Sequence, residues 1–224
     1  GTNTDAVLVE GSTVLGAVKT VTTEDVTGGI RAALKDLAAS TGEAMRDVAA
    51  VMIGTTHFVN AVVQRRELNR VAALRVCLPA SATLPPMVDW PEDLATLANG
   101  GTYLVAGGHE YDGRPIAAMD EHAIAEAGRK MKADAITAAA VSAVFSPLTD
   151  TCEVRASEIL LNEHPDLRIT RSGTLGRIGL LERENAALLN ACLIDLSHRT
   201  IDAFEAAIRD SGIRARLFIT QNDG

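Results

Sequence analysis

The two ends of the chain carry the sequence feature that most restricts its fold: at each end, an apolar segment adjoins a turn rich in Gly, Thr, Asn and Asp. The first turn is Gly1-Thr2-Asn3-Thr4-Asp5, and it leads directly into the apolar residues 6–9. The second is Thr220-Gln221-Asn222-Asp223-Gly224, and it follows the apolar residues 217–219. A turn of this composition can point several N–H groups and hydroxyls at one anion. We therefore expect two phosphate-binding half-sites that face one nucleotide.

The terminal turns also bear on how much of a protein this chain represents. A hairpin needs a strand on each side of its turn, and each terminal turn has a strand on one side only. We therefore expect a fragment that is cut at both ends within functional motifs. The 224 residues, 47% of them hydrophobic, are enough for a sizeable core and for more than one compact domain.

Charge and cysteine usage exclude several classes of function. The formal net charge is −8 and no stripe of Lys and Arg is present, so we expect no nucleic-acid partner. The longest apolar stretch, residues 135–145, is too short to span a bilayer and predicts a buried strand, so we expect no membrane partner. Three cysteines without any CxxC spacing indicate reduced thiols in or near the core of a cytoplasmic protein: Cys77, Cys152 and Cys192.

Strand-like and helix-like segments alternate along the chain. Extended segments are predicted at residues 6–9, 14–20, 48–53, 71–78, 103–106, 135–145, 168–170 and 217–219. Helices are predicted at residues 23–42, 58–66, 92–97, 121–132 and 152–162. A long apolar stripe over residues 181–208 predicts one helix, or two joined near Ser197. This alternation predicts a mixed or parallel sheet with helices on both faces.

Five motifs resemble those of the hydantoinase A/oxoprolinase family, and they follow that family's order over essentially the whole chain. They are the two terminal turns, Gly54-Thr55-Thr56-His57 with Asn60-Ala61, Phe145-Ser146-Pro147, and the segment 179–185 with Leu189-Asn190-Ala191. The family belongs to the superfamily of sugar kinases, actin and heat-shock chaperones, in which two ribonuclease H-like domains close over ATP.

The resemblance implies an α/β fold, a ribonuclease H-like (actin-like ATPase) domain whose mixed sheet is flanked by helices and which is truncated at both ends. Residues 1–180 would form the N-terminal ATPase domain. Residues 181–224 would form a linker helix with the first strand and phosphate turn of the second ATPase domain. The family pattern begins with a strand that ends in an acidic residue and two glycines. This chain keeps only the second glycine, so we expect the catalytic aspartate of the family to lie outside it.

The resemblance also implies a reaction, an ATP-dependent opening of a cyclic amide such as a hydantoin or 5-oxoproline. Phosphorylation would make the amide oxygen a leaving group, and phosphoryl transfer depends mainly on positioning and charge neutralisation. Two alternatives stay open: an ATP-dependent carboxylase subunit that acts on a ketone, and a non-catalytic ATP-driven clamp or reactivating chaperone. The expected partners are ATP, Mg²⁺, a small cyclic amide, and a hydantoinase B-type subunit or a second copy of the chain.

The terminal turns are the expected nucleotide site. The residues expected to contact the phosphates are Gly1, Thr2, Asn3, Thr4, Thr220, Gln221, Asn222, Asp223 and Gly224. Asp5 and Asp223 are the carboxylates expected to hold Mg²⁺, directly or through water, and Asp5 is also a candidate catalytic residue. The alternative for both is a turn residue bonded to its own backbone.

The segment Gly54-Thr55-Thr56-His57 ends a predicted buried strand where a helix starts, which is the position at which open α/β sheets bind ligands. We expect Gly54, Thr55, Thr56 and Asn60 to contact the substrate, and His57 to orient it or to move a proton as a catalytic residue. Helix capping by the threonines and a structural role for His57 are the alternatives.

Two further segments carry weaker signals. His109-Glu110-Tyr111-Asp112 mixes metal-ligand types, but it equally suits a solvated hairpin tip. Glu182 and Glu184 open a predicted helix, where acidic groups favour the helix dipole, so capping explains both. Glu182 remains a candidate catalytic residue because its segment belongs to the family resemblance and borders the expected interdomain hinge.

Overall fold

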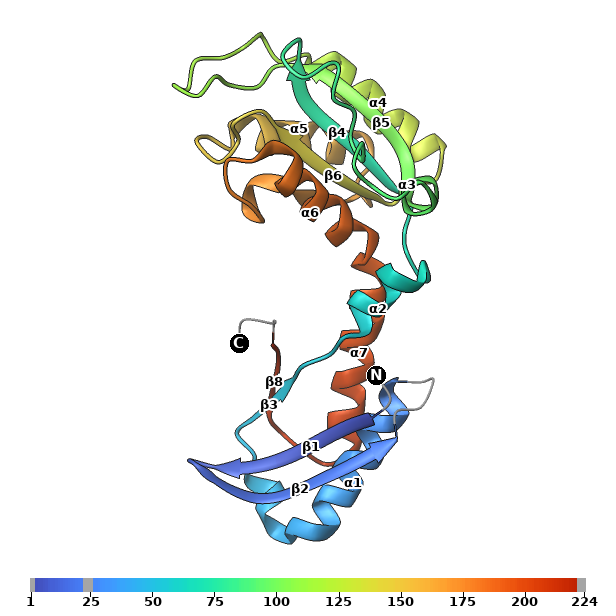
Figure 1. Cartoon of the computed structure of the whole chain (residues 1–224), viewed down its shortest axis with the longest axis vertical. Helices are drawn as coiled ribbons and strands as arrows, with labels where there is room; N and C mark the ends of the chain where they lie inside the picture. Colours follow the sequence, from blue (N-terminus) through green and yellow to red (C-terminus); the bar gives the residue numbers. More distant parts are fainter. Residues whose placement is uncertain (1–2, 22–25, 221–224) are drawn as a thin grey trace. The chain divides into compact units, whose positions relative to one another are not determined.

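The computed structural model describes residues 3–21 and 26–220, and it forms two compact units (Figure 1). Residues 1–64 and 196–224 belong to the first unit, and residues 65–195 form the second. The second unit is therefore inserted in sequence within the first. The boundary predicted at residue 180 separates two ATPase domains and is a different division from that of these two units. It stays a prediction.

The first unit contains two short sheets. An antiparallel sheet pairs β1 (Asn3–Glu10) with β2 (Thr13–Val21), and a parallel sheet pairs β3 (Ala50–Ile53) with β8 (Arg216–Ile219). The helices of this unit are α1 (Val26–Thr41), the 3-10 segment η1 (Gly42–Asp47), α2 (His57–Gln64) and α7 (Ile194–Asp210), which enters it from the second unit.

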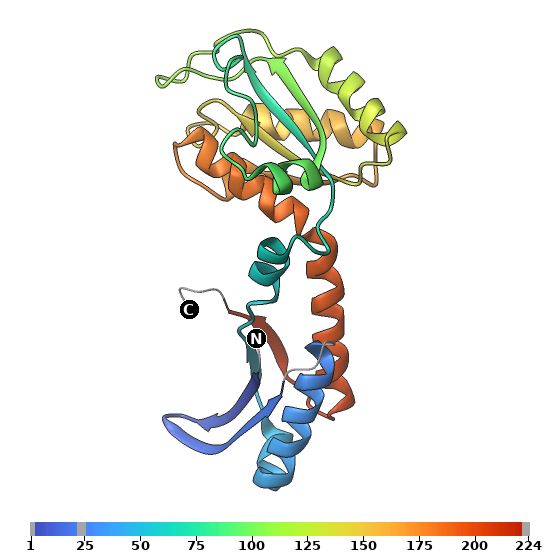
Figure 2. The same cartoon turned by 45° about the vertical axis from the view of Figure 1, so that its right-hand side comes forward.

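One apolar core serves both sheets of the first unit. Alternate residues of β1 and β3 point into it and meet Leu34 and Leu37 of α1 and Ile208 of α7. Figure 2 shows the β1–β2 hairpin beside α1, which contacts both strands. A glycine permits this close approach, because a Cβ at Gly16 would lie 2.4 Å from Cγ2 of Thr41. The shared core fixes the two sheets in one unit.

The second unit is built on a four-stranded parallel sheet in the order β5-β4-β6-β7. Its strands are β4 (Val71–Leu78), β5 (Asn99–Ala106), β6 (Ala138–Ala143) and β7 (Arg168–Arg171). Its helices are α3 (Glu92–Ala98), α4 (Glu121–Ala133), α5 (Thr151–Glu163), the 3-10 segment η2 (Ser172–Thr174) and α6 (Leu180–Cys192). Asp120 caps α4 as predicted, since its Oδ1 accepts from the N–H of Ala123 at 2.9 Å.

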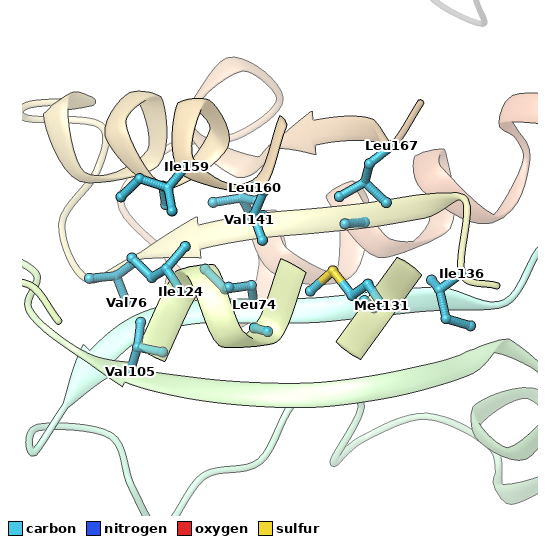
Figure 3. Close-up of a cluster of buried hydrophobic side chains, with 14 of the residues drawn as sticks. Leu74, Val76, Val105, Ile124, Met131, Ile136, Val141, Ile159, Leu160 and Leu167 are labelled. Atoms are coloured by element: carbon cyan, nitrogen blue, oxygen red, sulfur yellow. The ribbon is translucent and has the colours of Figure 1, made fainter. Parts of the chain in front are cut away.

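Helices cover both faces of this sheet, as the alternation of segments predicts (Figure 1). On one face, Leu74 and Val76 of β4 pack with Ile124 of α4 and Leu160 of α5 in the cluster drawn in Figure 3. On the other face, Val71 and alternate alanines of β4 and β6 pack against α6. Strands buried on both sides are continuous apolar runs, which is the pattern that made them recognisable in the sequence.

The helices and strands agree with the predicted order, but three features differ. The predicted single sheet is three sheets. The long apolar stripe breaks at Leu193, which lies between α6 and α7, and not near Ser197. The first strand begins at Asn3, because the backbone from Asn3 to Asp5 already pairs with β2. Within the described ranges, no helix is long and apolar enough to cross a bilayer.

Candidate functional site

Two parallel strands of the first unit end side by side. The register pairs Ile53 of β3 with Ile219 of β8, and the next residue, Thr220, donates its N–H to the carbonyl of Ile53 at 3.0 Å. The Thr220 hydroxyl also lies 3.4 Å from that carbonyl oxygen, and a Cβ at Gly54 would lie 3.1 Å from the same hydroxyl. Gly54 and Thr220, far apart in the sequence, are therefore neighbours at the carboxyl ends of adjacent strands. We call this place the strand-end site.

The threonines after Gly54 organise the start of α2. The Thr55 hydroxyl accepts the N–H of His57 at 3.1 Å, and the Thr56 carbonyl accepts the N–H of Asn60 at 2.9 Å. The amide of Asn60 also donates to the Thr56 hydroxyl at 3.4 Å. Thr55 therefore acts as a helix cap, which was one of its two predicted roles. A hydroxyl that accepts one hydrogen bond still has its own proton to donate, so capping leaves it able to bind a ligand.

His57 is the first residue of α2 and is half-buried. Its ring is tilted against that of Phe58, with the two ring centroids 6.1 Å apart. The predicted residues Gly54, Thr55, Thr56, His57 and Asn60 follow β3 in one segment, and the fold places Thr220 beside Gly54.

The predicted first turn is partly strand. Asn3, Thr4 and Asp5 lie in β1, where Asp5 is paired across the ladder with Lys19. Their side chains also form an ion pair of 3.3 Å between Oδ1 and Nζ, and both are exposed. An exposed pair of this kind contributes little to stability and is exchanged easily for another partner. Asp5 is therefore a surface carboxylate of the hairpin, and its predicted roles stay predictions.

Several predicted phosphate contacts fall outside the described residues. They are Gly1, Thr2, Gln221, Asn222, Asp223 and Gly224, so their roles stay predictions. Within residues 3–21 and 26–220, no group of three or more His, Cys, Asp or Glu side chains is placed to hold a metal ion. The described part of the chain thus offers Asp5 alone of the two predicted Mg²⁺ carboxylates.

The second unit contains a buried ion pair that the sequence analysis missed. Arg75 of β4 and Glu184 of α6 are both almost inaccessible, and the Arg75 Nε donates to Glu184 Oε1 at 2.8 Å. The Ser142 hydroxyl donates to the same oxygen at 2.6 Å, and Arg75 also donates to the carbonyl of Leu84. Burial alone lowers the pKa of Arg75, but the hydrogen bond and charge of Glu184 outweigh burial and raise it. Glu184 therefore fixes α6 to the sheet and does not serve as a helix cap.

A second buried network lies at the start of α6. The Arg183 Nε donates to the Ser172 hydroxyl at 3.0 Å, and Ser172 donates to Glu153 Oε1 at 2.6 Å. Arg183 also donates to the carbonyls of Ile178, at 2.8 Å, and of Ala143. Burial lowers the pKa of Arg183, and the charge of Glu153 is the largest opposing effect. For the Arg75 network, the sequence does contain a signal, because Arg75 is a single charged residue within the apolar strand β4.

The remaining candidates belong to the second unit. Glu182 is exposed near the start of α6. The segment from His109 forms the predicted hairpin tip, with a bridge from His109 to Pro115 and an ion pair between Asp112 and Arg114 at 2.8 Å. All three cysteines are free thiols, as predicted, and burial raises the pKa of Cys192 to about 12.

Residues 1–164 match the model of the protein family described as Hydantoinase/oxoprolinase N-terminal region. A comparison with curated proteins finds no significant match.

Two solved structures resemble the chain. An ATP-dependent caprolactamase from Pseudomonas jessenii has a TM-score of 0.77 and 24% sequence identity, over 97% of this chain and 34% of the caprolactamase chain. A nucleotide-free structure of acetone carboxylase, described with ATP-dependent acetone carboxylation, has a TM-score of 0.70 and 17% identity, over 88% of this chain and 31% of the other. The chain thus spans about a third of the length of these structures. The likeness shows a mixed α/β fold that is compatible with an actin-like ATPase.

Proposed function

The chain belongs to the family of hydantoinase/oxoprolinase N-terminal regions, and from this premise we propose that it is part of an ATP-dependent enzyme that opens a cyclic amide. The similarity to a caprolactamase supports this reaction, because caprolactam is a cyclic amide. Hydantoins and 5-oxoproline are further rings of the same chemical class. The proposed enzyme is a hydrolase of the hydantoinase or 5-oxoprolinase type.

The observation that carries the proposal is the contact between Gly54 and Thr220 at the strand-end site. In open sheets of parallel strands, ligands bind at the carboxyl ends of the strands, among the loops and helix N-termini that follow them. Here the two segments supply threonine hydroxyls next to a glycine, where the absence of a side chain lets a ligand approach the backbone. Such donors suit phosphate oxygens and an amide carbonyl alike.

In the proposed reaction, ATP supplies the phosphoryl group that activates the ring. The amide oxygen attacks the γ-phosphorus, the bond from that phosphorus to the bridging oxygen breaks, and ADP leaves. Water adds to the resulting imidate carbon, and the carbon–nitrogen bond breaks while the ring nitrogen takes up a proton. A second water attacks the acyl carbon, the bond from that carbon to the phosphate oxygen breaks, and phosphate leaves with the former amide oxygen while a carboxylate remains. Most of the rate enhancement would come from positioning and from neutralising phosphate charge.

The residue roles follow the predicted assignment. Gly54, Thr55, Thr56 and Asn60 are proposed to hold the ring, and His57 to orient it or to give the proton to the ring nitrogen. The phosphates are proposed to lie against Asn3, Thr4 and Thr220 and the turn residues Gly1, Thr2, Gln221, Asn222, Asp223 and Gly224. Glu182 stays a proposed catalytic residue of the second unit.

Mg²⁺ is proposed to bind with the nucleotide. Mg²⁺ in nucleotide sites takes most of its ligands from phosphates and water and needs only one or two carboxylates, which Asp5 and Asp223 would provide. Its bound charge would offset the negative charge of the phosphates. A hydantoinase B-type subunit or a second copy of the chain is the proposed protein partner.

A second candidate reaction has a specific observation in its favour. The likeness to acetone carboxylase supports an ATP-dependent carboxylase subunit, in which a ketone oxygen takes the place of the amide oxygen. Both reactions use the same activation of a carbonyl oxygen, so they differ in the substrate that stimulates ATP hydrolysis.

Steady-state ATP hydrolysis by the full-length protein, with any partner subunit supplied, tests this proposal. Hydantoins, 5-oxoproline and caprolactam form one panel, and ketones with bicarbonate form a second. We expect stimulation by at least one lactam. His57→Ala should reduce that stimulation about tenfold or more and leave nucleotide affinity nearly unchanged, because His57 is proposed to touch the ring and not the phosphates.

The control is His122→Ala, which removes an exposed histidine of α4 in the second unit. If only ketones stimulate ATP hydrolysis, the protein is a carboxylase subunit. If only a protein partner stimulates it, the protein is an ATP-driven clamp. Equal stimulation of wild type and His57→Ala would remove His57 from the site.

A further inference from the structure

A hollow of about 420 Å³ lies beside the first turn of α6 in the second unit. Its lining includes Leu175, Gly176 and Arg177 from the loop after η2, and Glu182, Arg183 and Ala186 from α6. Its volume lies in the range of sites that bind small organic molecules. We call it the α6 hollow.

The floor of the α6 hollow is held rigidly. The buried Arg183 donates to the Ile178 carbonyl at 2.8 Å and to Ser172 at 3.0 Å, so the loop and the helix cannot separate without exposing a buried charge. Gly176 packs so closely on this floor that a Cβ there would lie 2.4 Å from Cβ of Arg183. The hollow is thus a preformed feature of the loop.

Two opposite charges lie on the rim of the hollow. Arg177 and Glu182 are both exposed, and no hydrogen bond or ion pair joins their side chains to other described residues. Burial lowers the pKa of Arg183, and the nearby charge of Glu182 acts to raise it. Glu182 folds back toward Gly179, where a Cβ would lie 2.2 Å from its Oε2. The side chains of Leu175 and Ala186 contribute apolar lining to the same hollow.

We propose that the α6 hollow binds a small amino acid through both of its charged ends. Arg177 would hold the carboxylate, Glu182 the ammonium group, and Leu175 with Ala186 the aliphatic chain between them. The choice of an amino acid rests on the proposed function, because opening caprolactam or 5-oxoproline produces an amino acid, with at least one carboxylate, one ammonium group and an aliphatic body. The hollow is thereby a site for the product in the second unit.

The chain contains a second hollow of similar size that serves as a control. It lies in the first unit and is lined by Glu205, Arg209 and Arg216 together with apolar residues. Glu205 and Arg209 are four residues apart on α7, and no ion pair joins their side chains to each other. This hollow therefore carries opposite charges without belonging to the proposed site.

The test is direct binding to the whole chain without ATP, measured by calorimetry or ligand-detected NMR. The probes are 6-aminohexanoate, glutamate, hexanoate and hexylamine. We expect saturable binding of at least one amino acid and weaker binding of both singly charged probes. Arg177→Gln should weaken binding of the amino acid and of hexanoate about fivefold and leave hexylamine unchanged. Glu182→Gln should weaken the amino acid and hexylamine and leave hexanoate unchanged.

The matched controls are Arg209→Gln and Glu205→Gln, which should bind every probe as the wild type does. The opposite selectivities of the two rim variants cannot arise from a general loss of structure. Absence of saturable amino-acid binding would overturn the proposal, as would equal effects of Arg177→Gln and Glu182→Gln on both singly charged probes. Because the assay involves no turnover, its outcome is independent of whether lactams stimulate ATP hydrolysis.

Discussion

Buried charges determine how α6 is held on the sheet of the second unit. Arg75 and Glu184 have side-chain exposures of 0% and 2%, and each has its partner within the same network. A buried pair of this kind adds little net stability over apolar residues, but loss of one member leaves an uncompensated charge. The pair therefore specifies where α6 sits more than it strengthens the unit.

Removing one member of this pair should therefore be costly. Arg75→Met should lower the free energy of unfolding by about 3–5 kcal/mol, because Glu184 stays buried without its partner. The double variant Arg75→Met/Glu184→Leu should recover much of the loss. Urea denaturation of both variants measures this difference. Arg155→Met, which breaks the exposed pair with Glu121, is the control and should change stability much less. A double variant no more stable than the single one would contradict this view.

Apolar periodicity predicted which residues of β4 and β6 are buried, but it could not predict their polar partners. Arg75 stands out within an apolar strand, yet Glu184 is distant in sequence and was explained as a helix cap. Local patterns reveal that a charge is buried, and only the tertiary structure reveals what neutralises it.

At the scale of elements, the strand-end site depends on the parallel pairing of β3 with β8. Both strands and the turns after them were predictable, because each has an apolar run followed by Gly or Thr. Their pairing was not, because strands so far apart in the chain leave no local signal. The same limitation explains why a single sheet was predicted where three are present. Within the predicted first turn, Asn3, Thr4 and Asp5 are strand residues, because their polar side chains suit a strand as well as a turn.

The Thr220 hydroxyl offers a test at this scale. Thr220→Ala in the full-length protein should reduce ATP turnover about tenfold or more, which is the cost of losing a preorganised donor. Stability should change by less than about 0.5 kcal/mol, because the hydroxyl is exposed and its bond to the Ile53 carbonyl is long. Thr174→Ala, which removes a similar exposed hydroxyl bound to the Arg171 carbonyl, should leave turnover unchanged. Normal turnover in Thr220→Ala would exclude Thr220 from the nucleotide site.

At the scale of the whole molecule, the second unit has the properties of an inserted domain. It is continuous in sequence, and its sheet is covered on both faces by its own helices. The first unit is assembled from two separate segments that share one core. Sequence periodicity identified the helices and strands of both units. It did not reveal the insertion, because the alternation of helices and strands continues without interruption through residues 65 and 195.

This organisation predicts that residues 65–195 fold on their own. The excised segment should unfold in one cooperative transition and keep the buried amides of β4 and β6 protected from hydrogen exchange, because every strand of its sheet and both core clusters are included. Calorimetry and hydrogen exchange on the excised segment and on the whole chain provide the comparison. A segment without a cooperative transition would show that the first unit is required for its stability.

The claim at the centre of this account is that ATP activates the ring by phosphorylating its amide oxygen. The most direct test supplies the full-length protein and its partner with ATP, Mg²⁺ and a lactam labelled with oxygen-18 at the carbonyl, using caprolactam, hydantoin and 5-oxoproline in turn. Mass spectrometry then locates the label in the products. The account predicts that the ring that turns over transfers label to inorganic phosphate. Phosphate free of label, with all of it kept in the carboxylate of the opened ring, would contradict the account.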